Sequence, residues 1–193
     1  MSDNLLNLVP TRLRPLGAIE PRFALLFCVA LLTGASLSAS LALACATPFA
    51  AYAVVASAML PLPSALIAVT AAWAVNQAIG FSVLGYPHDP LTLAWGLAIG
   101  AAALVATAAS MFVLRSSRRT GGPVALGFAL VGAYAAYELV LFSATPILGG
   151  AGSFTLAIVG RLGVLNLVWL IGLAAACEVF RLLNLIRRGQ TAS

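Results

Sequence analysis

From Phe23 to Leu114 the sequence contains a single charged side chain, that of Asp89. A soluble domain cannot cover its surface with so few charges, because about a quarter of its residues are normally charged. The whole chain shows the same shortage, since 62% of its residues are hydrophobic, 8% are charged and the mean hydropathy is +1.07. This composition excludes a soluble globular protein, a disordered chain and a disulfide-stapled secreted module. It predicts an all-α polytopic membrane protein.

Prolines and turn residues divide the chain into six predicted helices. Each crossing needs about 20 apolar residues, so a chain of 193 residues can hold six. Breaks are expected at Thr47-Pro48, at Leu60-Pro61 and in the polar segment 85–90. The six helices are placed at about 24–43, 48–60, 64–84, 91–114, 123–142 and 156–183. This gives a transmembrane domain over residues 23–185, with tails at 1–22 and 186–193.

The arginines predict the orientation of these helices. With six crossings, nine of the ten arginines fall on one side of the membrane, and Arg161 falls on the other. Basic residues stay in the cytoplasm during insertion, so both termini are predicted to be cytoplasmic in a multi-pass protein of the bacterial inner membrane. The run from Phe23 to Ala46 is longer than the ~7–15-residue core of a signal peptide, and we expect it to remain as the first helix. No basic stretch has the interleaved aromatic and polar residues of a nucleic-acid-binding face.

The residue types argue against catalysis. The chain has one histidine, no C-x-x-C pair and no G-x-x-x-x-G-K-[ST] nucleotide loop. Only Asp89, Glu138 and Glu178 lie in or beside the predicted spans, too few for a two-metal site. We therefore expect no enzyme activity, no cofactor and no metal. The three cysteines, which lie inside apolar runs, are expected to be small packing residues: Cys28, Cys45 and Cys177.

Polar side chains are predicted to gather in the outer half of the bundle. Glu138 and Arg161 fall at comparable depths on consecutive antiparallel helices, so we expect an ion pair between them. That pair either only locks the two helices together or borders an outward-facing pocket for a polar solute. His88 is either a solvated turn residue or the single imidazole available to a ligand. The candidate ligand-binding residues are Asn76, Gln77, Tyr86, His88, Asp89, Trp95, Tyr137, Glu138, Arg161 and Asn166.

Small residues recur at every fourth position of the first predicted helix. Ala30, Gly34, Ser38 and Ala42 form one continuous stripe, which we call the small-residue stripe. Such a stripe lets a second helix approach closely within the bilayer. Shorter stripes begin at Gly96 and Gly100 and at Gly132 and Ala136. Two interpretations remain open for the first helix: packing inside the bundle, or docking of a separate membrane subunit.

This arrangement resembles the substrate-binding S components of energy-coupling factor transporters, which are small bacterial vitamin importers. The resemblance rests on the chain length, six helices with both termini inside, the small-residue stripe and the longer outer loops between helices three and four and between five and six. It implies binding and uptake of a vitamin-like small molecule enclosed by the outer loops and helices four to six. It also implies a transmembrane coupling subunit with ATPases, docked on Ala30, Gly34, Ser38 and Ala42.

The solitary cobalamin importers related to these components are also similar in size. Their cysteine ligand for cobalt has no counterpart in the segment 80–90, where only His88 could substitute. Two alternatives to a vitamin importer remain open. One is a structural or assembly membrane protein without a transported ligand, and the other is a proton-coupled small-solute transporter that uses the Glu138–Arg161 pair.

Overall fold

The computed structural model describes the backbone of residues 21–43, 46–117 and 122–190. Within these ranges the chain forms α1 (Pro21–Leu43), α2 (Phe49–Met59), α3 (Leu62–Ser82), α4 (Pro90–Ser116), α5 (Gly122–Leu148), the short 3-10 helix η2 (Ala151–Ser153) and α6 (Leu156–Gln190). The predicted all-α class is confirmed for this part of the chain. Arg12, Arg14, Cys45, Arg118 and Arg119 lie outside the described residues.

Five of the described helices, α1 and α3 to α6, are long and apolar enough to cross a membrane. Many of their large apolar side chains face outward, and Phe112, Ile147 and Leu156 are 71%, 86% and 90% exposed. Monomeric soluble proteins rarely expose a continuous apolar surface of this kind. The chain is therefore a multi-pass membrane protein.

The helix boundaries differ from the prediction mainly near the end of the chain. α5 continues past the expected end at residue 142 to Leu148, with Pro146 in its last turn. A proline removes the hydrogen bond to the carbonyl four residues earlier, and the hydroxyl of Thr145 donates to that Phe142 carbonyl at 2.8 Å. The helix therefore tolerates the proline. α6 runs to Gln190, so the segment predicted as a tail from 186 is helical up to that residue.

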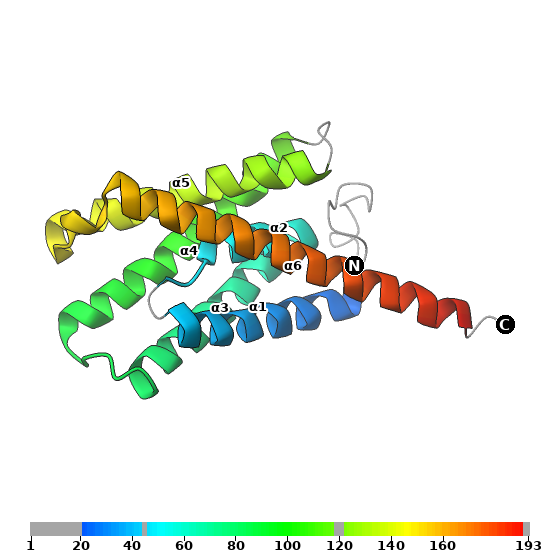
Figure 1. Ribbon diagram of the computed structural model, residues 1–193, viewed down its shortest axis with the longest axis horizontal. Coiled ribbons are helices and arrows are strands. Elements are labelled where there is room, and N and C mark those ends of the chain that lie inside the picture. Colours follow the sequence, from blue (N-terminus) through cyan, green and yellow to red (C-terminus); the bar gives the residue numbers. More distant parts are fainter. Residues whose placement is uncertain (1–20, 44–45, 118–121, 191–193) are drawn as a thin grey trace, which may run out of the picture.

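The helices alternate in direction along the chain. The Ser36 hydroxyl donates to the Ala72 carbonyl, and the Asn76 amide donates to Ser40, so α1 and α3 run parallel and the chain returns between them through α2. The rings of Phe27 and Phe180 stack with centroids 4.1 Å apart. The start of α1 therefore lies beside the later part of α6, at what we call the terminal end. The segments 83–89 and 149–155 lie at the opposite end, the loop end (Figure 1).

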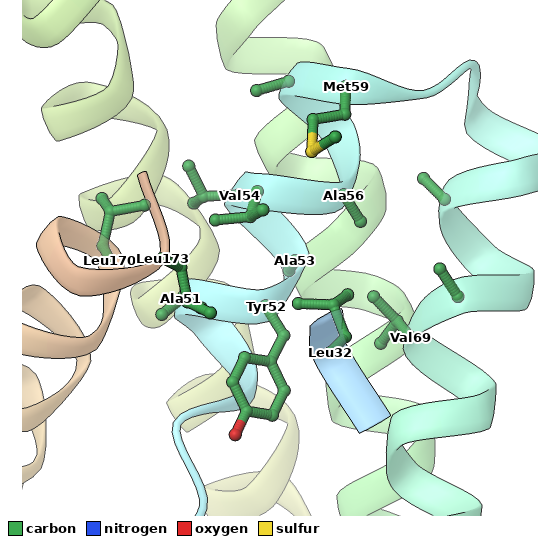
Figure 2. Close-up of a cluster of buried hydrophobic side chains, with 14 of the residues drawn as sticks. Leu32, Ala51, Tyr52, Ala53, Val54, Ala56, Met59, Val69, Leu170 and Leu173 are labelled. Carbon is green, nitrogen blue, oxygen red and sulfur yellow. The ribbon is translucent and has the colours of Figure 1, made fainter. Parts of the chain in front are cut away.

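The short helix α2 forms the centre of the bundle. All eleven of its residues are buried, and α1, α3 and α6 contribute Leu32, Val69, Leu170 and Leu173 around it (Figure 2). The helix ends at Met59, because Pro61 pushes the residue before it, Leu60, into an extended conformation. Cys28 and Cys177 are buried free thiols, as expected for packing residues, and the Cys177 sulfur lies 3.5 Å from that of Met59.

Helix α1 packs through the side opposite to the small-residue stripe. Its buried side chains include Cys28, Leu32, Ser36 and Ser40, whereas Ala30, Gly34, Ser38 and Ala42 are exposed. Nothing lies within 4 Å of the position that a side chain at Gly34 would occupy. The interpretation that this stripe packs inside the bundle is therefore wrong.

The two shorter stripes differ from the stripe on α1, because their glycines face side chains of other helices in the bundle. Gly96 faces Gln77, Gly100 faces Trp73, and Gly132 faces Val113.

Candidate functional site

A cavity of about 320 Å³ lies toward the loop end of the bundle. It is lined by the segment before α2, by α4 and α5, by the connection that contains η2, and by the first turns of α6. Its polar lining residues are Thr47, Tyr134, Tyr137, Glu138, Ser153 and Asn166, and the aromatic rings of Trp95 and Phe154 complete its walls. A pocket of mainly apolar walls with a few converging polar groups is typical of a small-molecule site.

The shortness of α2 explains why the cavity exists. Eleven residues of helix rise only about 16 Å, roughly half of the ~30 Å hydrocarbon core. Residues 46–48 before it are not helical, and non-helical backbone at membrane depth is tolerated only where it is buried in protein or lines a cavity. Ala46 and Thr47 line this cavity. The cavity therefore lies beyond the start of α2, toward the loop end.

Asn166 holds the first turn of α2 against α6. Its Oδ1 accepts a hydrogen bond from the Ala51 amide at 3.0 Å, and its Nδ2 donates to the Leu162 carbonyl at 3.0 Å. The Ala51 amide belongs to the first turn of α2, and the amides of a first turn have no partner within their own helix. Asn166 therefore lines the cavity but also has a structural role. The nearby Tyr52 hydroxyl is buried without a partner among the described residues, and Figure 2 shows it directed away from Met59, toward the start of α2.

The expected ion pair between Glu138 and Arg161 is not formed. Ile158 and Leu162 of α6 line the cavity, whereas Arg161 is exposed outside it. A long arginine side chain near a helix end can extend to the polar interface instead of entering the bundle. Between described side chains, the ion pair observed is that of Arg181 with Glu178, at 2.7 Å.

Glu138 lies near Tyr134 instead. The Tyr134 hydroxyl donates its proton to the Val159 carbonyl at 2.6 Å. Tyr134 thus connects α5 to α6 beside the cavity. It also lines a second, apolar groove of about 640 Å³ between these helices, with Phe128 and Val131. Its ring therefore separates the polar cavity from that groove.

Asn76 and Gln77 do not line the cavity. The Asn76 Nδ2 donates to Ser40 Oγ at 2.9 Å and to Thr47 Oγ1 at 2.8 Å, and its Oδ1 accepts from Gln77 at 3.2 Å. The structure does not bring these two predicted ligand-binding amides into the cavity, because they pair with each other, with Ser40 of α1 and with Thr47 before α2. Asn76 instead positions Thr47, which does line the cavity.

The loop residues also lie outside the cavity. Tyr86 packs over Gly80, and the exposed His88 lies with its ring centroid 5.1 Å from that of Phe81. Asp89 caps α4, since its Oδ1 accepts from the amides of Leu91 and Thr92 and its Oδ2 accepts from the Thr92 hydroxyl. These hydrogen bonds, the Thr92 hydroxyl first, lower the pKa of Asp89 below its ordinary value.

Four of the ten candidate ligand-binding residues therefore meet in the cavity: Trp95, Tyr137, Glu138 and Asn166. The candidate set omitted Thr47, Tyr134, Ser153 and Phe154, which the structure adds. One signal for Thr47 was present in the sequence. A proline directly after it, inside an otherwise apolar run, marks the non-helical segment that a cavity requires.

Comparison with known proteins assigns no relative. No protein-family model, curated protein or solved structure matches the chain.

Proposed function

We propose that this chain is a six-crossing protein of the bacterial inner membrane that binds a vitamin-like small molecule from the outer face and takes part in its uptake. The observation that carries the proposal is the cavity of about 320 Å³ toward the loop end, with polar groups from α5, α6 and the segment before α2. Its size falls at the lower end of the range for small-molecule pockets, about 300–1,000 Å³. The function is that of the S components which the sequence resembles.

The orientation follows from the arginines and the helix directions together. Because successive helices alternate in direction, the last helix, α6, runs toward the terminal end (Figure 1). Arg115 lies in the last turn of α4 and Arg181 lies near the end of α6, so both lie at the terminal end. The terminal end is then cytoplasmic by the arginine rule, and the cavity faces outward.

The small-residue stripe is the proposed docking surface for a transmembrane coupling subunit with ATPases. Helices associate in lipid by close packing of small residues, and the stripe is exposed instead of being used within the bundle. The proton-coupled alternative can no longer use a Glu138–Arg161 pair, because Arg161 does not pair with Glu138, and it would depend on the Glu138 carboxyl alone. A structural protein without a ligand remains the alternative that the experiment must exclude.

The test is to purify the protein in mild detergent and identify any small molecule that co-purifies, by mass spectrometry. Leu162→Trp places a large ring in the cavity, and Ile171→Trp places the same ring on the lipid-exposed side of α6. We expect the wild type and Ile171→Trp to retain one molecule that Leu162→Trp loses, together with its uptake by cells. A wild-type preparation free of any specific molecule, from cells that take up no solute through it, would contradict the proposal.

A further inference from the structure

The charges around the cavity indicate which molecules it can accept. Among the lining residues that the structure describes, Glu138 has the one carboxyl side chain, and none is an arginine, lysine or histidine. Arg161, the nearest arginine along α6, is exposed outside the lining. An anionic ligand would therefore meet a carboxyl group in a low-dielectric site without a positive partner, which is unfavourable.

The Glu138 carboxyl also lacks enough hydrogen-bond donors. An ionised carboxylate can accept about four hydrogen bonds, whereas a tyrosine hydroxyl has one proton to donate. The neighbouring Tyr134 hydroxyl donates its proton to the Val159 carbonyl at 2.6 Å. That proton is therefore not available to the Glu138 carboxyl. A bound cation would supply the missing positive partner.

The amides at the start of α2 do not change the preference of the cavity for a cation over an anion. The N-terminus of a helix attracts anions through amides that have no partner. Three of the first four amides of α2, those of Phe49, Ala51 and Tyr52, are bonded to Thr47, Asn166 and Pro48 respectively. These amides are not available to an anion in the cavity.

The aromatic walls suit a cation as well as a flat ring. Trp95, Tyr134, Tyr137 and Phe154 come from three different segments around Glu138. A cation over an aromatic face gains about 0.5–2 kcal/mol, more when it is desolvated. On these grounds, and resting on the proposed function, we propose that the ligand is a compact aromatic organic cation, with its charge at Glu138.

Two probes that differ only in charge test this assignment. The cation 1-methylnicotinamide and the neutral 3-methylbenzamide have the same shape, because a ring carbon replaces the charged nitrogen. Equilibrium dialysis against the protein in lipid nanodiscs measures both affinities. We expect the wild type to bind the cation at least about tenfold more tightly than the neutral probe, a difference of about 1.4 kcal/mol.

Two variants separate the effect of Glu138 from a general loss of charge. Glu138→Gln should bring the ratio of the two affinities close to one. Glu178→Gln, which removes a carboxylate that pairs with Arg181 away from the cavity, should leave the ratio unchanged. If Glu138→Gln fails to fold, Trp95→Leu takes its place: it should weaken cation binding several-fold, while Phe81→Leu, outside the cavity, should not.

Each remaining outcome contradicts the assignment in a distinguishable way. Equal binding of both probes to the wild type would refute the cation and leave the proposed solute-binding function intact. Binding of neither probe at millimolar concentration would also refute it, and the co-purification experiment would then decide the proposed function by itself. A charge preference that survives in Glu138→Gln would place the cation elsewhere and overturn the inference.

Discussion

Asn76 joins three segments that are distant in the sequence. Its Nδ2 donates both of its protons, to Ser40 Oγ on α1 and to Thr47 Oγ1 before α2. A side-chain amide can donate two hydrogen bonds, so this group is fully used. The sequence identified Asn76 as a polar residue inside a span but could not identify its partners, because their pairing depends on how α1 packs against α3. The residue predicted to bind ligand therefore has a structural role.

Replacing Asn76 with leucine should destabilise the protein. Interhelical hydrogen bonds in membrane proteins contribute about 0.6 kcal/mol on average and up to about 1.7 kcal/mol, so losing two of them should lower the free energy of unfolding by about 1–3 kcal/mol. Unfolding in mixed micelles with increasing denaturing detergent measures the change. Ser82→Ala is the control, because the exposed Ser82 hydroxyl bonds only within its own helix, to Ala78. Equal stability of Asn76→Leu and Ser82→Ala would show that the interhelical bonds contribute little.

Asp89 gives a pH-dependent prediction outside the membrane-spanning segments. Its pKa is lowered by the hydroxyl and amide of Thr92, so the capping interaction is present above the pKa of the unfolded chain and is lost as pH falls through the lower, folded-state pKa. Asp89→Ala should increase amide exchange at Leu91 and Thr92 at neutral pH, and this difference should disappear in strong acid. Asp89→Asn keeps an acceptor that does not titrate, so its protection should not change with pH. A neutral-pH exchange rate unchanged by Asp89→Ala would contradict the capping role.

At the scale of single helices, α1 presents two faces with opposite properties. One face is buried against the bundle, and the small-residue stripe on the other face is exposed. A fourfold repeat in the sequence cannot distinguish the two, because Cys28, Leu32, Ser36 and Ser40 repeat with the same spacing as the stripe. The packing of α1 against the rest of the bundle, mainly against α3, decides which face is buried.

Two glycine substitutions should therefore have different effects. Gly34→Leu adds its side chain into open space, whereas a Cβ at Gly100 would lie 2.8 Å from the Trp73 ring. We expect normal folded yield from Gly34→Leu, and for Gly100→Leu a loss of stability of about 1–3 kcal/mol from overpacking. Size-exclusion chromatography and thermal unfolding in detergent measure both. If the stripe docks a coupling subunit, Gly34→Leu should also lose uptake while keeping the bound ligand. A misfolded Gly34→Leu would show that the stripe contacts the bundle after all.

The positions of the other helices were largely predictable from the sequence. Pro61 and Pro90 mark breaks that the structure places within a few residues of the expected points. Local chemistry decides these boundaries, because a proline restricts its neighbour and lacks a donor. The depth of α2 was not predictable in the same way. Its eleven residues are as apolar as a spanning helix, and only the packing of Thr47 and Asn166 shows where the helix starts within the bundle.

At the scale of the whole molecule, the alternating directions of the helices support an even number of crossings. α1 and α3 run parallel, so in the proposed topology the chain between them returns through the bilayer, although its helix covers only about half of that distance. Five helices of spanning length and one shorter helix thus combine into six proposed crossings. The terminal end and the loop end then lie on opposite sides of the membrane.

Cysteine labelling in intact cells tests this topology. His88→Cys and Gly152→Cys place thiols at exposed positions of the loop end, and Ser116→Cys places one at the terminal end. The parent protein for these variants carries only the substitution Cys45→Ala, because Cys28 and Cys177 are buried and should not react with the label. A membrane-impermeant maleimide should label His88→Cys and Gly152→Cys in intact cells, and should label Ser116→Cys only after the membrane is opened. Labelling of Ser116→Cys from outside would reverse the orientation and would turn the cavity toward the cytoplasm, where it could not receive a solute for uptake.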